Sequence, residues 1–378
     1  QKIALDLNGT NTISLFGVQG AGKSYSIGTV MEMTLRQFQN VNYLSHPLAG
    51  VIFHYSESED YKPEFTSMIY PNTKPDEVNK LRQGYQAQPD RVRDIVLLVP
   101  KAKVLERRQE YPNIPVVPIS FASSELGIKE WKFLMGAANN SALYIKQFNN
   151  LLRSLREDIT LANLENAIAT TKLLSAAQKE LATMRLSLAK EFINDAVELK
   201  QLLKPGRLLL VDLRDEFIEK DDALSIFVVM LNIFAAARQE DGSTFNKFIV
   251  FDEAHKYMAN KSLTNVIVET IREMRHKGIS LMIASQDPPS LPTEIIELST
   301  ILLAHRFNSP QWLKHIQKAL IHLAHLTPEE MAGLKQGEAF FWTSKSNDPK
   351  FTHRAVKIKT RPRVTQHGGA TLTAGGKK

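Results

Sequence analysis

Short apolar runs alternate with amphipathic stretches along most of the chain, and this pattern predicts a sheet covered by helices. The apolar runs have the length of buried strands, whereas the amphipathic stretches have helical spacing. We expect strands at 50–55, 94–100, 114–120, 207–213, 248–251, 279–284 and 300–305, with a final pair at 338–344 and 351–358. We expect helices at 23–38, 222–238, 263–276 and 310–319. The alternation predicts an α/β fold with a mostly parallel central sheet.

Two stretches depart from this alternation. Residues 3–16 hold an Asn-Gly pair between two apolar runs, which predicts two short strands joined by a tight turn. Residues 140–202 contain no Gly or Pro, and they predict two or three helices. Apolar residues recur there at helical spacing, for example Leu173, Leu174, Ala177, Leu181, Met184 and Leu188.

These elements suggest four parts. Residues 1–55 and 206–360 should together form the α/β core. Residues 56–139 would be an insertion of mixed strands and loops, and residues 140–205 a helical insertion. Residues 361–378 are expected to be a basic, Gly-rich tail that is either mobile or docked on a neighbouring subunit.

Composition narrows the class of protein. The 378 residues include no cysteine, which excludes disulfides, thiolate metal sites and cysteine nucleophiles. No apolar run approaches the roughly 20 residues of a membrane span, and no signal peptide follows Gln1, so we expect a cytoplasmic protein, processed, trimmed or a fragment. The net charge of +7 comes from residues 350–378, which hold eight basic residues and no acidic one, whereas residues 1–349 have a net charge of −1. The body therefore carries no global basic field for nucleic acid.

Residues 17–24, Gly-Val-Gln-Gly-Ala-Gly-Lys-Ser, match the phosphate-loop pattern G-x-x-x-x-G-K-[ST]. Glycines let the backbone turn its N–H groups toward phosphates, Lys23 reaches the β- and γ-phosphates, and the Ser24 hydroxyl ligates Mg²⁺. A chance Gly-rich turn is disfavoured by the apolar run before the loop and the helix after it. We therefore predict ATP and Mg²⁺ as cofactors, bound by Gly17, Gln19, Gly20, Ala21, Gly22, Lys23, Ser24 and Tyr25.

A pair of carboxylates, Asp252 and Glu253, ends the apolar run 248–251. In phosphate-loop enzymes an aspartate at this place completes the Mg²⁺ shell, and a following glutamate can act as general base on the attacking water. The alternative is an acidic strand end that caps the next helix. His255 completes a D-E-A-H string, but the chain has one phosphate loop and no second lobe, so we interpret His255 as structural or coupling.

Further polar residues follow the carboxylates. Gln286 stands at the tip of the run 279–284, where its amide could contact the γ-phosphate and water. Arg272, Arg275 and Arg306 are candidates for a guanidinium that stabilises developing phosphoryl charge. For each arginine the alternative is an ion-paired or solvated surface residue. The catalytic set predicted from sequence is thus Glu253, Lys23, Gln286, Arg275, Arg306 and Arg272.

Taken together, these motifs resemble the HerA–FtsK superfamily of P-loop ATPases, most closely its HerA branch. The resemblance rests on Gly17–Ser24, on 50–55 with Glu57, Glu59 and Asp60 behind it, on 204–213, on 248–255, on Arg272-Glu-Met-Arg-His-Lys-Gly278, on Ile283-Ala-Ser-Gln286 and on 301–306. It implies a RecA-like core, a hexameric ring with nucleotide sites between subunits, and translocation of double-stranded DNA. It also implies Gln286 as a sensor and arginines that complete the site in cis or in trans.

The sequence departs from this family in three respects. The family's trans arginine can lie upstream of the phosphate loop, and no arginine precedes the loop here. HerA proteins usually carry an N-terminal β-barrel, whereas about a dozen residues precede the phosphate loop here, so we expect a missing part or a motor domain of a longer polypeptide. The run 50–55 lacks the family's Asp-Pro. The resemblance places the helical segment 140–202 on the ring face, and the alternative is a plain packing insert.

Three functions remain open from the sequence. The first is an ATP-driven DNA translocase or helicase that works with a nuclease or another effector in DNA processing or anti-phage defence. The second is a nucleotide-gated ring that assembles effectors, and the third is a conjugation- or secretion-type ATPase. Basic residues that could grip DNA phosphates, or could equally be solvated loop charges, are Lys256, Lys261, Lys101, Lys103, Arg107 and Arg108.

Overall fold

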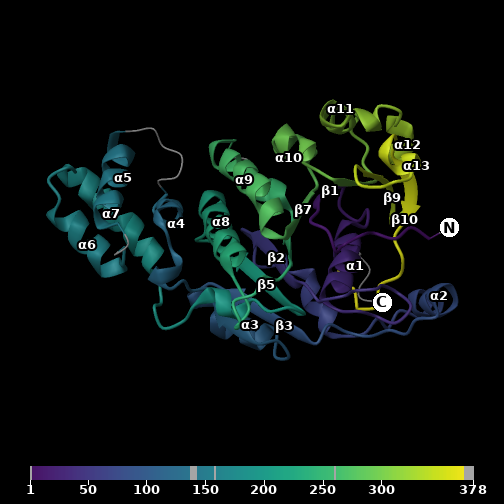
Figure 1. The fold of residues 1–378 in the computed structure, drawn as a ribbon, viewed down its shortest axis with the longest axis horizontal. Coiled ribbons are helices and arrows are strands. Elements are labelled where there is room, and N and C mark those ends of the chain that lie inside the picture. The colour runs from purple at the N-terminus through teal and green to yellow at the C-terminus, as the bar shows by residue number, and fades with distance from the viewer. Residues whose placement is uncertain (1, 137–142, 157–158, 259–260, 370–378) are drawn as a thin grey trace.

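The computed structural model describes residues 2–136, 143–156, 159–258 and 261–369, and Figure 1 shows their arrangement. In this part of the chain ten strands form one sheet, with the order β10-β9-β8-β1-β7-β6-β2-β5-β3-β4. The strands are β1 (Thr12–Phe16), β2 (Ala49–Ser56), β3 (Asp94–Val99), β4 (Val116–Pro118), β5 (Arg207–Arg214), β6 (Lys247–Phe251), β7 (Ile279–Ser285), β8 (Ile301–His305), β9 (Glu338–Thr343) and β10 (Val356–Lys359). All neighbours from β8 to β4 are parallel, and β9 pairs antiparallel with both β8 and β10. The predicted α/β fold with a mostly parallel sheet is confirmed.

Helices cover both faces of this sheet. They are α1 (Lys23–Leu35), α2 (Pro75–Tyr85), α3 (Val104–Glu110), α4 (Ile128–Leu134), α5 (Leu143–Leu155), α6 (Leu161–Thr170), α7 (Ala176–Lys190), α8 (Lys220–Ala236), α9 (Lys261–Met274), α10 (Thr293–Glu297), α11 (Pro310–Ala319), α12 (Pro328–Ala332) and α13 (Pro349–Thr352). Successive side chains of a strand point to opposite faces. In β5, Leu209 and Val211 therefore join a core with α8, whereas Leu208 and Leu210 join a second core with α1.

The N-terminal hairpin predicted for residues 3–16 is wrong. Only its second half forms a strand, β1, and residues 2–7 have no regular structure. The reason is the position of β1 inside the sheet, where β7 and β8 pair with its two edges in parallel register. No edge of β1 is left for an antiparallel partner, so the Asn-Gly pair is a bend between an irregular segment and a central strand.

The end of the sheet also differs from the expectation. The expected element 351–358 begins as the short helix α13 and continues as the edge strand β10. Asp348 caps this helix, because its side chain accepts a hydrogen bond from the backbone N–H of Lys350 at 2.9 Å, and Pro349 occupies the first helical position.

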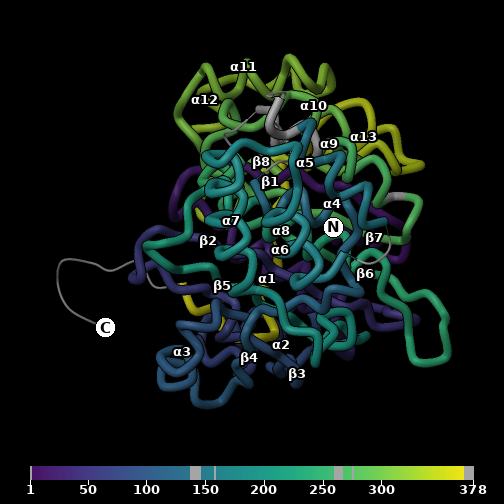
Figure 2. The backbone as a smooth tube through the Cα atoms, turned by 90° about the vertical axis from the view of Figure 1, so that its left-hand side faces the viewer, coloured from purple at the N-terminus to yellow at the C-terminus, as the bar shows by residue number. Residues whose placement is uncertain are grey.

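Residues 56–205 contribute to two different layers. Strands β3 and β4, from the segment that we expected to be an insertion, extend the central sheet beyond β5. Helices α5, α6 and α7 form a bundle at one side of the molecule, and α4 connects it to α8 (Figure 1). In the turned view this bundle lies in front of α8 and the strands (Figure 2). Within the described residues of 140–202, the three helices α5, α6 and α7 agree with the two or three helices predicted from the sequence.

Residues 361–369, which we call the strap, pack on α1 of the same chain. Arg361 forms an ion pair with Glu32 of α1 at 2.6 Å, and the side chain of Arg363 is fully buried. Gly28 makes room for Arg363, because a Cβ at Gly28 would lie 2.3 Å from its guanidinium. The described part of the expected tail 361–378 is thus an integrated segment whose arginines are used inside the fold, and residues 370–378 lie outside the described residues.

A buried lysine at the start of β6 gives a pH-dependent prediction. Lys247 is 1% exposed, its Nζ donates to Ala237 O and Phe245 O at 3.1 Å each, and burial lowers its pKa to about 8. The unfolded chain holds this proton up to about pH 10.4. Between the folded-state pKa of about 8 and the unfolded-state pKa of about 10.4, the unfolded state binds more protons than the folded state. The free energy of unfolding should therefore rise with pH in this range. We expect the free energy of unfolding of the wild type minus that of Lys247→Met to increase from pH 8 to pH 10 in urea titrations. An equal difference at both pH values would contradict a neutral Lys247.

Candidate functional site

The phosphate loop lies between the carboxyl end of β1 and the first turn of α1. Its backbone has left-handed φ values of 154° at Gly17, 74° at Gly20 and 111° at Gly22, which only glycine adopts without strain. A Cβ at Gly17 would also lie 2.7 Å from Cβ of His305, the buried last residue of β8. The loop is therefore shaped by its own glycines and by the neighbouring strand.

Lys23, the first residue of α1, is 5% exposed and turns back over the loop. Its Nζ donates to Val18 O at 3.3 Å and lies 3.8 Å from Glu253 Oε1. Burial lowers the pKa of Lys23, and the nearby carboxylates of Glu253 and Asp252 partly offset this. A cation held at the N-terminus of a helix, beside a glycine-rich loop, is suited to bind phosphate oxygens.

Glu253 follows β6 in a left-handed conformation, with φ of 49°, and its side chain is buried. This unusual backbone directs the carboxylate toward the phosphate loop, where Oε1 accepts a hydrogen bond from Gln286 Nε2 at 2.6 Å. Burial raises the pKa of Glu253 above its ordinary value, and the adjoining carboxylate of Asp252 raises it further. A carboxylate with a raised pKa accepts a proton more readily, as a general base requires.

Asp252 is 6% exposed, and its Oδ2 lies 3.7 Å from Nδ1 of His54 on β2. That nitrogen and Glu253 Oε2 are buried and have no hydrogen-bond partner within the described residues. Orphaned polar atoms beside a phosphate loop leave room for further polar ligands. The oxygen donors at Ser24 and Asp252 fit a hard cation such as Mg²⁺.

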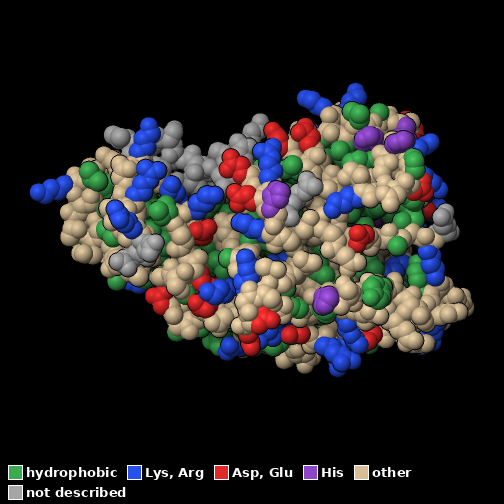
Figure 3. Space-filling model, in the orientation of Figure 1, with side chains coloured by type: hydrophobic (Ala, Val, Ile, Leu, Met, Phe, Trp, Pro, Cys, Tyr) green, Lys and Arg blue, Asp and Glu red, His purple; other side chains and the backbone are tan. Residues whose placement is uncertain are grey.

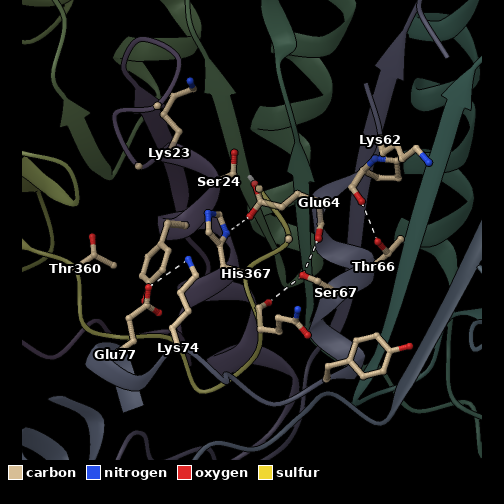
Figure 4. Close-up of a pocket in the computed structure, with 18 of the residues that line it drawn as sticks. Lys23, Ser24, Lys62, Glu64, Thr66, Ser67, Lys74, Glu77, Thr360 and His367 are labelled. Atoms are coloured by element: carbon tan, nitrogen blue, oxygen red, sulfur yellow. Dashed lines mark hydrogen bonds and ion pairs between the residues drawn. The ribbon is translucent and has the colours of Figure 1, made fainter. Parts of the chain in front are cut away.

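Lys23, Glu253 and Gln286 border a cavity of about 1390 Å³, large enough for a nucleotide, whereas Asp252 and His54 do not line it. Figure 4 shows one wall of it, with Lys23 and Ser24 from α1 and Glu64, Ser67 and Glu77 from the segment after β2. Of the predicted nucleotide-binding residues, those that line the cavity are Gln19, Gly20, Gly22, Lys23, Ser24 and Tyr25. Gly17 and Ala21 lie beneath, and Ala21 O accepts a hydrogen bond from Gly337 N at 3.3 Å.

Tyr25 is engaged within the protein. Its hydroxyl donates to Glu77 at 2.8 Å and accepts from the backbone N–H of Arg363 at 2.7 Å, and its ring meets His367 edge to face at 5.1 Å. The tyrosine thereby joins α1, α2 and the strap along one wall of the cavity. A nucleotide could meet only its ring.

The three candidate arginines lie at two ends of the sheet. Arg306 follows β8 at the carboxyl edge, is half-buried, and its carbonyl accepts a hydrogen bond from Val18 N at 3.0 Å. Arg272 and Arg275 precede β7 at the opposite edge, about 20 Å away by the rise of a seven-residue strand. Arg272 is exposed, and the side chain of Arg275 lies outside the described residues. Within one chain these two arginines cannot reach the phosphate loop.

The basic residues suggested for DNA contact have different surroundings. Lys103 and Arg107 form ion pairs with Glu59, and Arg107 is buried, so neither is a free surface cation. Lys101 and Arg108 are exposed. On the face shown in Figure 3 basic and acidic side chains are interspersed. The side chain of Lys261 lies outside the described residues.

Sequence reasoning missed three residues of the site. His54 and Tyr61 lie beside the carboxylate pair. His305 lies beneath the loop, where its Nε2 forms a hydrogen bond of 3.0 Å with Ser26 Oγ. His54 interrupts an otherwise apolar strand, which was a usable signal, because a polar residue in a buried strand needs a partner. Tyr61 belongs to a polar loop without periodicity and gave no such signal.

The sheet order, the helices on both faces and the phosphate loop between β1 and α1 define the fold of a RecA-like P-loop NTPase. Among solved structures, VirB4 of Thermoanaerobacter pseudethanolicus is similar, with a TM-score of 0.52 and 12% identity over 95% of this chain and 98% of that chain. The plasmid coupling protein TrwB in complex with the non-hydrolysable GTP analogue GDPNP has a TM-score of 0.54 and 10% identity over 97% and 92%. The unbound form of the bacterial conjugative coupling protein TrwBdeltaN70 has a TM-score of 0.53 and 11% identity over 94% and 87%.

At sequence identities of 10–12%, the similarity to these structures shows a shared fold and no more than that. No protein-family model matches the sequence, and no curated protein is significantly similar to it. Among the described residues, no helix combines the length and apolar character needed to cross a bilayer.

Proposed function

We propose that the protein hydrolyses ATP and uses the energy to translocate double-stranded DNA. The observation that carries this proposal is the convergence of Lys23, Glu253 and Gln286 beside the phosphate loop, within 3.8 Å of one carboxylate oxygen. Lys23 begins α1, and Glu253 and Gln286 follow the ends of β6 and β7, so all three residues lie at the carboxyl edge of the sheet. Nucleotides commonly bind at this edge in open parallel sheets. The GTP analogue in the similar TrwB complex supports a nucleotide at this place.

In this proposal the residues have separate roles. Lys23 and the backbone N–H groups of the loop bind the β- and γ-phosphates, and Ser24 and Asp252 hold Mg²⁺, which would neutralise phosphate charge when bound. Glu253 takes a proton from the attacking water as its oxygen bonds to the γ-phosphorus. The bond between that phosphorus and the β–γ bridging oxygen breaks, and its electron pair leaves on ADP. Gln286 holds the carboxylate and senses the γ-phosphate.

We further propose a hexameric ring of HerA type in which Arg272 or Arg275 of one subunit completes the site of the next. The exposure of Arg272 and its place at the edge opposite the loop support a role in trans, and Arg306 at the near edge remains the candidate in cis. A ring of this type would act with a nuclease or another effector in DNA processing or anti-phage defence. Local loops would have to grip DNA, because residues 1–349 are nearly neutral.

The second candidate is a conjugation- or secretion-type ATPase. The observation that favours it is the fold itself, since VirB4 and the coupling protein TrwB are similar structures with TM-scores above 0.5. Stimulation by DNA separates a DNA translocase from an ATPase that moves protein.

The test measures ATP turnover of the wild type and of Glu253→Gln, each with and without linear duplex DNA. We expect turnover that rises several-fold with duplex DNA and falls by at least about a hundredfold in Glu253→Gln, because general-base catalysis contributes roughly 10²–10⁴-fold. Binding of a non-hydrolysable ATP analogue should remain. Glu240→Gln, at an exposed loop glutamate, is the control. An ATP turnover that is the same with and without duplex DNA would contradict translocation. The absence of any ATP turnover would contradict the proposal that the protein is an ATPase.

A further inference from the structure

The loop after β2, residues 57–63, brings a second donor to Glu253. Tyr61 Oη donates to Glu253 Oε1 at 3.3 Å, the same oxygen that accepts from Gln286 Nε2. Glu253 Oε2, in contrast, is buried without a hydrogen-bond partner among the described residues. His255 Nδ1 lies 3.4 Å from Oε2, but this nitrogen accepts from the backbone N–H of Gln286 and has no proton to give. The two carboxylate oxygens of Glu253 therefore differ in their hydrogen bonding: Oε1 accepts two hydrogen bonds, and Oε2 accepts none from the described residues.

Neighbouring side chains fix the ring of Tyr61. The imidazole of His54 stacks on it with centroids 5.3 Å apart, and His54 Nε2 donates to Tyr61 O at 2.8 Å. Lys256 Nζ lies 3.8 Å from the ring centroid, in cation–π contact. Although Tyr61 as a residue is 36% exposed, both its backbone and its ring are held by these contacts. The hydroxyl therefore approaches Glu253 from a defined direction.

A buried ionic cluster anchors the loop that carries Tyr61. Glu59 pairs with the buried Arg107, and its carbonyl accepts from Arg214 Nη1 at 2.8 Å. Arg214 is almost fully buried, at 1% exposure. Lys62, on the other side of Tyr61, pairs with Glu110 at 2.7 Å. Contacts on both sides of Tyr61 hold the loop in place, and Glu59 is the acidic residue after the strand 50–55 that takes part.

We propose that Tyr61 is a positioning residue for Glu253 in ATP hydrolysis. Together with Gln286 it occupies Oε1, so that Oε2 faces the attacking water and takes its proton. Without the second donor the carboxylate could rotate, because the terminal torsion of glutamate is broad. This inference rests on the proposed function, and it adds to that function the oxygen that acts and the residue that selects it.

The variant Tyr61→Phe removes only the hydroxyl. We expect kcat for ATP to fall about tenfold, since the lost hydrogen bond is made to a charged group, while the Kd for a non-hydrolysable ATP analogue with Mg²⁺ stays within about twofold. Tyr70→Phe is the matched control, because its hydroxyl contacts Asn113 at 2.7 Å and not Glu253. Thermal unfolding of both variants should match the wild type, which excludes a folding defect.

A double-mutant cycle with Glu253→Gln separates positioning from a general structural role. Tyr61→Phe should slow the wild type but leave the residual turnover of Glu253→Gln unchanged. An equal loss in both backgrounds would overturn the inference, as would an unchanged kcat of Tyr61→Phe in an active enzyme. If the wild type itself shows no turnover with or without duplex DNA, the proposed function fails, and this inference fails with it.

Discussion

Replacing Lys23 by alanine should weaken binding of ATP with Mg²⁺ by at least about a hundredfold and reduce turnover below detection. Lys23 is the buried cation of the phosphate loop. Its charge-assisted hydrogen bonds to phosphate oxygens would be stronger than hydrogen bonds between neutral groups. Its loss also leaves Glu253 beside Asp252 without the nearest positive charge. Isothermal titration with a non-hydrolysable analogue measures the affinity, and phosphate release measures the turnover.

The control for this variant is Lys80→Ala, which removes an exposed lysine from the lining of the same cavity. We expect it to bind nucleotide as the wild type does, since an exposed charge contributes little. Unaltered affinity in Lys23→Ala would show that the cavity binds nucleotide elsewhere. Equal losses in both variants would indicate a diffuse electrostatic attraction instead of a phosphate loop.

The sequence predicted the central sheet because its signals are local. Apolar runs such as 248–251 and 279–284 are buried on both faces, and no other element type accommodates them at that length. The phosphate loop and the carboxylate pair were predictable for a related reason. Their spacing and the elements around them follow from what a phosphate needs, and the structure places Lys23 and Glu253 3.8 Å apart.

The parts that sequence did not predict depend on long-range pairing. Residues 3–16 have the pattern of a hairpin, but β7 and β8 pair with the two edges of β1 and leave no edge for a hairpin partner. Arg361 and Arg363 have the composition of a solvated tail, because nothing nearby in sequence shows their distant acidic partners. Arg363 pairs with Glu64. Arg361 pairs with Glu32, an acidic residue between Met31 and Met33 inside the apolar helix α1. A charge at such a position indicates a buried carboxylate that must be paired.

Glu32 is the anchor of the strap. Its carboxylate accepts from the backbone N–H groups of Val364 and Thr365 at 3.1 and 3.0 Å and from Thr365 Oγ1 at 2.8 Å, and Arg361 completes the set. The side chain is fully buried. Since Gln366, His367, Gly368 and Gly369 line the cavity beside the phosphate loop, the strap connects the middle of α1 to the candidate site at its N-terminus.

We expect Glu32→Gln to destabilise the docked strap by about 3 kcal/mol, because breaking a buried, hydrogen-bonded ion pair leaves its partners uncompensated. One carboxylate oxygen becomes an amide NH₂ group that faces N–H donors, and Arg361 loses its ion-pair partner. Hydrogen exchange of the Val364 and Thr365 amides should accelerate about a hundredfold, while amides in β6 and β7 keep their protection if the strap opens alone.

Glu180→Gln, at an exposed glutamate of α7, is the control. Unchanged exchange at residues 364–365 would contradict the role of Glu32, whereas a loss of protection throughout the sheet would show that the strap and the core unfold as one unit.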